Sequence, residues 1–231
     1  MTNFFTKFTL VIAIALFSFA FKSNAQVTLA TSGVQIACEG SAINLGSPGT
    51  DKAWVVRYDA NSATPSNPTT LTITGNTIAA ADVKTGYYLI TNTSTDPAVC
   101  ASDAQTIALF VLPTLTPTFT SSDYCSENAT ITDFVASVTP NTPPTGATLS
   151  YQWYTVIGGT EAAISGATSA TFHPTITNNT TSSITATYRL KTAYQIGGSY
   201  YCAQSIDQTV NVLPKAATPS ITIGSTGSST L

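Results

Sequence analysis

Short runs of alternating apolar and polar residues, separated by clusters of Gly, Pro, Asn and Asp, follow one another along most of this chain. Between residues 184 and 194, Ile, Ala, Tyr and Leu alternate with Thr, Arg and Lys. A period of two predicts a β-strand with one buried face. Gly197 and Gly198 interrupt the run, and residues 205–213 resume it as the expected hairpin partner.

Similar patterns predict further strands in both halves of the chain. Residues 149–154 place Trp153 on one face with two other apolar side chains, and Trp54 alternates in the same way with Val56 and Tyr58. Residues 86–92 and 106–112 are two more apolar, β-branched runs. We expect Trp54 and Trp153 to be buried core residues, each between the two sheets of its own domain.

A repeated segment divides the chain into modules. The sequence IALFVLPTLTP at 107–117 and the sequence VNVLPKAATP at 210–219 are both an apolar strand closed by Leu-Pro and, after a spacer, Thr-Pro. Proline cannot donate to a β-ladder, so each segment is typical of a last strand that runs into a linker. We therefore expect module 1 at 26–113 and module 2 at 114–214, each of a size that suits a seven-stranded sandwich.

The final stretch, 215–231, resembles the opening of module 2. TPSIT at 218–222 matches TPTFT at 116–120. We expect the start of an incomplete third module or a disordered tail, since one strand cannot satisfy its own ladder groups. An alternative is a donor strand that completes a neighbouring subunit, as in a filament-forming protein.

The first 25 residues predict export. Lys7 precedes an apolar run at 8–21, and Ser23-Asn24-Ala25 follows as a cleavage site. This run has the length of a signal-peptide core and is too short to span a bilayer, and no later run approaches a transmembrane segment. We therefore expect a signal peptide at 1–25 and a secreted or cell-surface protein. Four cysteines in an exported chain indicate two disulfides, with three possible pairings.

The composition argues against nucleic acid and anionic lipid as partners, and it indicates no catalytic residues. Charged residues make up 8% of the chain and the net charge is −3, which offers no basic surface for nucleic acid or anionic lipid. The single histidine, His173, precedes a proline, and eleven carboxylates are scattered, mostly in turns. We expect no enzyme, catalytic set, cofactor or metal cluster, and calcium binding stays open. Tyr194, Tyr200 and Tyr201 crowd the last hairpin and are possible ligand contacts.

Three motifs carry a family resemblance. The segments CEGSAINL at Cys38, YQWY at Tyr151 and ISGATSAT at Ile164, with cysteine, tryptophan and cysteine in that order in each module, resemble immunoglobulin-like repeats of large Bacteroidetes surface proteins. Such proteins are often substrates of type IX secretion, although a sorting domain is not visible before Leu231. The resemblance implies an all-β fold of tandem immunoglobulin-like β-sandwiches.

The same resemblance implies an extracellular structural or adhesive segment that spaces or displays a binding surface. Its partner would be an extracellular glycan or protein surface. The alternative function is a carbohydrate-binding or accessory module of a secreted polysaccharide-degrading enzyme. We expect the disulfides within modules, Cys38 with Cys100 and Cys125 with Cys202, at the rim of each sandwich.

Overall fold

The computed structural model describes residues 26–216 and 219–221. The expected signal peptide at 1–25 lies outside the described residues, as does most of the expected third-module start or tail at 215–231, including the donor strand considered for it. The chain divides into two compact units between Val111 and Leu112, two residues before the boundary that the repeat predicts.

The described part of the first unit contains eight strands and one short 3₁₀ helix. A five-stranded sheet has the order β1-β8-β7-β3-β4, and a three-stranded sheet has the order β2-β6-β5. The elements are β1 (Gln35–Cys38), β2 (Ile43–Asn44), β3 (Lys52–Asp59), β4 (Thr69–Leu71), β5 (Ile73–Thr74), β6 (Thr77–Ile78), η1 (Ala80–Asp82), β7 (Gly86–Ser94) and β8 (Gln105–Leu112).

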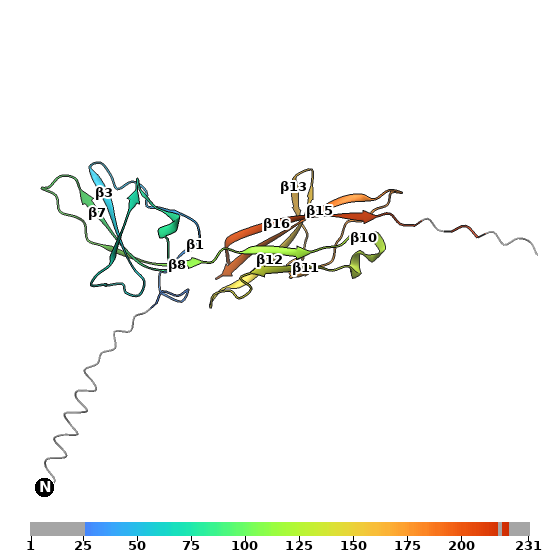
Figure 1. Ribbon diagram of the computed structural model, residues 1–231, viewed down its shortest axis with the longest axis horizontal. Coiled ribbons are helices and arrows are strands. Elements are labelled where there is room, and N and C mark those ends of the chain that lie inside the picture. Colours follow the sequence, from blue (N-terminus) through green and yellow to red (C-terminus); the bar gives the residue numbers. More distant parts are fainter. Residues whose placement is uncertain (1–25, 217–218, 222–231) are drawn as a thin grey trace, which may run out of the picture. The chain divides into compact units, whose positions relative to one another are not determined.

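The second unit repeats this plan with longer strands (Figure 1). Its five-stranded sheet has the order β10-β16-β15-β12-β13, and its three-stranded sheet has the order β14-β11-β9. The elements are β9 (Thr116–Thr120), β10 (Tyr124–Cys125), η2 (Ser126–Ile131), β11 (Phe134–Thr139), β12 (Thr148–Ile157), β13 (Thr160–Ala163), β14 (Thr171–Phe172), β15 (Ile184–Ile196) and β16 (Ser199–Leu213).

An aromatic core joins the two sheets of the second unit. Trp153 is fully buried, stacks on Phe172 with ring centroids 5.1 Å apart and meets Phe119 edge-on at 4.9 Å. Phe119 and Phe172 belong to the three-stranded sheet, whereas Trp153 belongs to the five-stranded one. The inward faces of both sheets therefore form one core, which makes the unit a β-sandwich.

The strand order identifies the sandwich type. In each unit the last strand lies between a short early strand and the penultimate strand of a five-stranded sheet, and a three-stranded sheet completes the unit. In the second unit, β10 pairs with β16 in parallel, and the other strand pairs are antiparallel. This is the two-sheet arrangement of immunoglobulin-like domains. The protein is all-β and consists of tandem immunoglobulin-like β-sandwiches.

The recognised sequence motifs have a structural role in the second unit. The backbone N–H of Trp153 donates to the carbonyl of Ala167 at 3.0 Å, and Ile164 N–H donates to the Trp153 carbonyl at 2.9 Å. The indole Nε1 of Trp153 donates to the carbonyl of Ser169 at 2.9 Å. The ISGATSAT segment thus continues the ladder beside YQWY and holds the buried tryptophan in place.

The two tryptophans differ in burial. The core position of Trp153 is confirmed, but Trp54 is only half-buried and packs against the edge of the first core cluster. Its indole Nε1 donates to the carbonyl of Gly46 at 3.0 Å. The fully buried side chain of β3 is Val56 instead. Full burial of Trp54 is therefore a wrong expectation: its strand is correct, but the indole lies at the rim, where Nε1 reaches a loop carbonyl.

Each unit also has a buried tyrosine whose hydroxyl binds backbone groups, a role that alternation in the sequence does not indicate. The Tyr88 hydroxyl accepts from the Lys84 N–H at 2.8 Å and donates to the Lys84 carbonyl at 2.9 Å. The Tyr188 hydroxyl accepts from the Ile176 N–H at 3.1 Å and lies 2.9 Å from the Tyr124 hydroxyl. Tyr88 fits the tyrosine corner of immunoglobulin domains, because its hydroxyl binds backbone a few residues upstream. The Gly-Tyr-Tyr sequence that opens the predicted strand at 86 was the available signal.

The predicted disulfide pairing is wrong. Cys100 and Cys125 are free thiols, so neither Cys38–Cys100 nor Cys125–Cys202 forms. Cys125 pairs in register with Leu213, at the opposite end of β16 from Cys202. Eleven residues along one strand at about 3.3 Å each separate their Cα atoms by more than about 30 Å, whereas a disulfide needs Cα atoms within about 7 Å. Cys125 and Cys202 therefore cannot form a bridge within their module.

Candidate binding surface on the second module

The outward face of the five-stranded sheet in the second unit carries charged, aromatic and amide side chains. Residues that pair directly across an antiparallel ladder share a face of the sheet. Trp153 pairs with Leu190, and both are buried, so the residues next to them point outward. The outward set on the three central strands is Ser150, Gln152, Tyr154, Thr187, Arg189, Lys191, Ala193, Gln195, Tyr200, Ser205, Asp207 and Thr209.

A hollow of about 620 Å³ lies on this outward face. Small residues from three neighbouring strands form its floor, namely Ser150 of β12, Ala193 of β15 and Ala203 of β16. Ser150 and Ala193 are direct partners across the β12–β15 ladder. The hollow arises because three small side chains are grouped where the neighbouring positions carry long ones. Its rim includes Tyr154, Lys191, Gln195 and Tyr200.

A β-bulge shapes one side of the hollow. Thr192 pairs with Gln204, but two positions further along β15, Tyr194 pairs with Tyr201. The β16 strand therefore has one extra residue here, and Cys202 has a φ of 54°, unusual for a residue other than glycine. The bulge changes the register, so that Tyr200 falls opposite Gln195 on the outward face.

The hairpin turn next to the bulge has the glycines that its geometry needs. Gly197 and Gly198 have φ values of 56° and 85°. Two successive positive φ angles define the type I′ turn, whose twist matches that of the flanking strands. The break predicted at these glycines is confirmed, and β16 begins immediately after them at Ser199, six residues earlier than predicted.

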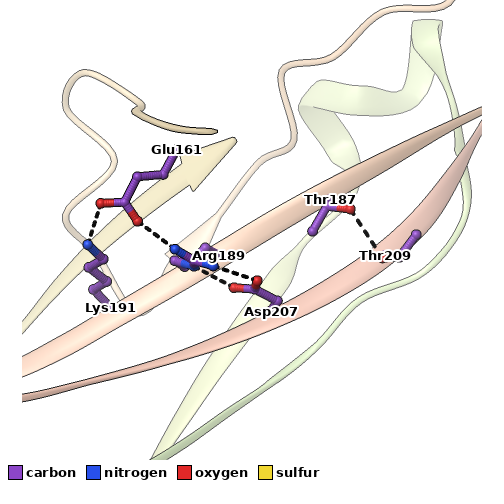
Figure 2. Close-up of polar contacts among 6 residues, drawn as sticks. All are labelled: Glu161, Thr187, Arg189, Lys191, Asp207 and Thr209. Carbon is purple, nitrogen blue, oxygen red and sulfur yellow. Dashed lines mark hydrogen bonds and ion pairs between the residues drawn. The ribbon is translucent and has the colours of Figure 1, made fainter. Parts of the chain in front are cut away.

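An ion-pair network borders the hollow on the same face (Figure 2). The Arg189 guanidinium binds Asp207 through two nitrogens, with Nε–Oδ1 and Nη2–Oδ2 distances of 2.6 and 2.8 Å, and binds Glu161 through Nη1 at 2.8 Å. The Lys191 ammonium binds the other oxygen of Glu161 and lies 4.8 Å from the Tyr154 ring centroid. Two cations and two anions are thereby paired, and Tyr154 is held beside them.

Hydrogen bonding moves the pKa values of these groups. Donation from Lys191 and then from Arg189 lowers the pKa of the Glu161 carboxyl below its ordinary value. The Arg189 guanidinium likewise lowers the pKa of the Asp207 carboxyl, and Arg189 itself has a raised pKa, mainly through Asp207. The two carboxylates and the guanidinium thus keep their charges at neutral pH, and with Lys191 the formal charges of the network sum to zero.

The three tyrosines predicted as ligand contacts lie on different faces of the sheet. Tyr200 is 63% exposed and borders the hollow. Tyr194 has no exposed surface and lies on the inward face opposite Leu149, so the expectation that it touches a ligand is wrong. Tyr201 is half-buried and pairs with Tyr194, again on the inward side. The sequence does not show the bulge that sends these neighbours to opposite faces. It also does not mark Ser150 or Ala193 as binding residues, and it marks Tyr154 only as part of the YQWY motif.

Other candidate groups lie elsewhere. His173 Nδ1 is 3.0 Å from an oxygen of Asp133, and both side chains are more than half exposed at the edge of the three-stranded sheet. Among residues 26–216 and 219–221, no three His, Cys, Asp or Glu side chains are grouped so that they could hold a metal ion. Within the same ranges, no helix has the length and apolar character needed to cross a membrane.

Comparisons with known proteins give structural likenesses only. No protein-family profile matches the chain, and no curated protein sequence matches it. Among solved structures, the chain is similar to the N-terminal four immunoglobulin domains of Dscam1 isoform 7.44, with 10% identity and a TM-score of 0.28 over 84% of this chain. It spans 47% of the length of that structure. It is also similar to the amphioxus IgVJ-C2 molecule, with 16% identity and a TM-score of 0.28, over 78% of this chain and 99% of that one.

Proposed function

We propose that this protein is an extracellular adhesive segment whose second module displays a binding surface on the outward face of its five-stranded sheet. The observation that carries the proposal is the hollow floored by Ser150, Ala193 and Ala203 beside an exposed Tyr200. Binding sites are concave, with apolar or aromatic walls and a few fixed polar groups. The immunoglobulin-like fold and the presence of disulfide-bonded cysteines fit a secreted or surface-exposed chain.

The sequence motifs support a more specific setting. We propose that the chain belongs with the immunoglobulin-like repeats of large Bacteroidetes surface proteins that type IX systems often export. Trp153 of the YQWY motif holds the core of the second module together, whereas Tyr151, Gln152 and Tyr154 of the same motif and Thr168 border the hollow. The repeat therefore supplies the scaffold and part of the rim, and the residues on the outward face determine what is bound.

Adhesion of coated beads tests the proposal. Beads carrying residues 26–216 would be washed under flow over surfaces coated with mucin glycoprotein, with the same glycoprotein after enzymatic deglycosylation, and with insoluble polysaccharides. Ala203→Arg fills the hollow, whereas Thr118→Arg places the same side chain on the exposed face of the three-stranded sheet. We expect wild-type and Thr118→Arg beads to be retained on at least one coating and Ala203→Arg beads to be released. Equal retention of all three, or retention of none, would overturn the proposal.

A further inference from the structure

The shape of the hollow limits what can enter it. Its floor consists of one hydroxyl and two methyl groups, and its volume of about 620 Å³ lies within the size range of small-molecule sites. The floor is part of a continuous hydrogen-bonded sheet, in which Ser150 pairs with Ala193. A ligand that lies flat against this floor would contact a rigid surface, because the three strands hold it in place. A flat, ring-shaped ligand fits this geometry better than a bulky side chain.

Two tyrosines on the outward face of the sheet border the hollow, from different strands. Tyr200 on β16 is 63% exposed, and a large apolar ring with so much exposed surface offers a face for stacking. Tyr154 on β12 is held by the Lys191 ammonium, 4.8 Å from its ring centroid. Tyrosine combines an apolar ring with a polar tip, which suits a ligand that has both apolar C–H faces and hydroxyl edges. Sugar rings have this combination.

The polar groups around the hollow are oriented. Gln152 donates from its amide nitrogen to the carbonyls of Trp153 and Ile164, both at 2.9 Å. These two bonds fix the orientation of the amide at the rim. Gln195 and Ser150 add further hydrogen-bonding groups. Fixed amides and hydroxyls at a concave surface confer orientation and specificity on a ligand rich in hydroxyls.

The charges around the hollow favour a neutral ligand over an acidic one. The only cation on the rim, among the residues that line the hollow, is Lys191, and Glu161 already pairs with it. The neighbouring Arg189 is paired with Asp207 and Glu161. A sulfated or uronic-acid ligand would have to compete with these carboxylates, whereas an uncharged ligand meets no such cost.

We propose that the hollow bordered by Tyr154 and Tyr200 binds a neutral oligosaccharide, with the Tyr200 ring stacked on one sugar unit. This inference rests on the proposed adhesive function and names the ligand class of the same surface. It assigns Tyr200 as the main contact, the small floor residues as the space for the sugar ring, and the ion-paired Lys191 as the support of the Tyr154 ring.

Calorimetric titration of residues 26–216 with neutral and acidic oligosaccharides tests this. The neutral probes are hexasaccharides of β-linked glucose, xylose, mannose and N-acetylglucosamine. The acidic probes are fragments of heparin and polygalacturonate. Each probe is titrated up to a concentration on the order of 10 mM, because weak binding saturates only at such concentrations. We expect saturable binding of at least one neutral probe. Its affinity should stay the same between about 50 and 500 mM NaCl, because screening weakens only charged contacts.

Three variants identify the site. Tyr200→Ala should weaken binding at least tenfold, whereas Tyr200→Phe should retain binding because stacking uses the face of the ring. Ile131 is a 75% exposed apolar residue outside the hollow, so Ile131→Ala should leave the affinity unchanged. Binding of acidic probes alone, no binding of any neutral probe, or an unchanged affinity in Tyr200→Ala would overturn the inference. Bead retention on deglycosylated protein would overturn the sugar assignment while leaving the adhesive function intact. Loss of retention on every coating would overturn both.

Discussion

Replacing Trp153 with alanine should destabilise the second module more than any other single truncation in its core. The side chain is fully buried, touches Phe119, Phe134 and Phe172, and donates its indole N–H to Ser169. Truncation of a buried Trp or Phe to Ala costs about 3 to 5 kcal/mol. Loss of the stacked and edge-on ring contacts and of the indole hydrogen bond places this case at the upper end of that range.

Trp54 provides the matched comparison. It is also a tryptophan on the fourth strand in the order of its five-stranded sheet and also donates its indole N–H to a carbonyl, but it is half-buried. We expect Trp54→Ala to cost about 1 to 2 kcal/mol, because less apolar area leaves water on folding. The contrast between the two variants isolates burial, since the residue type and the place of the strand in its sheet are the same.

Urea unfolding measures both effects. Each module has one tryptophan, so Trp54→Phe leaves a protein whose fluorescence reports the second module alone, and far-UV circular dichroism follows the alanine variants. A loss of about 4 kcal/mol with a slope near 2 kcal/mol/M lowers the urea midpoint by about 2 M. The expected thermal shift is roughly 15 °C or more for a module of about 100 residues. Equal shifts for Trp153→Ala and Trp54→Ala would refute the assignment of the core.

Three further results are expected. Tyr188→Phe should lower the stability of the second module by roughly 1 to 3 kcal/mol in urea unfolding, because it leaves buried N–H and hydroxyl groups without their partner; an unchanged midpoint would contradict the hydrogen-bond network. A thiol reagent should titrate two groups in the unfolded, unreduced chain, and peptide mapping should locate them at Cys100 and Cys125; no free thiols, or a different pair, would contradict the structure. The lowered carboxyl pKa values of Glu161 and Asp207 contribute stability above their ordinary values of 4.5 and 3.8 that is lost as the pH falls through the still lower folded pKa values. The melting temperature should therefore fall less between about pH 5 and pH 2 in a Glu161→Gln/Asp207→Asn variant than in wild type, and parallel curves would contradict the network.

The fold could be predicted because its determinants are local. Alternation between 184 and 194 specifies one buried face, and the two glycines at 197 and 198 specify the turn, so β15 and its hairpin follow from the residues themselves. The buried position of Trp153 follows from the same alternation. Trp54 shows the limit, since alternation places a side chain on a face but does not say how far the opposite sheet covers it.

The site and the disulfide could not be predicted because they depend on register. A single bulge in β16 puts Tyr200 on the outward face and Tyr201 on the inward one, and no periodicity in the sequence marks it. The floor of the hollow consists of Ser150, Ala193 and Ala203, which become neighbours only once the β12, β15 and β16 strands are aligned. The cysteines were paired by sequence symmetry between modules, whereas the length of β16 separates Cys125 from Cys202.

Nuclear magnetic resonance shows directly whether the outward face of the second module is the binding surface. The ¹⁵N-labelled chain of residues 26–216 would be titrated with the neutral oligosaccharide that binds best, and every backbone amide would be followed. We expect saturable shifts confined to β12, β15 and β16 around Ser150, Ala193 and Tyr200, and their loss in Tyr200→Ala. Shifts centred on the three-stranded sheet β14-β11-β9 or on the first module would contradict this expectation.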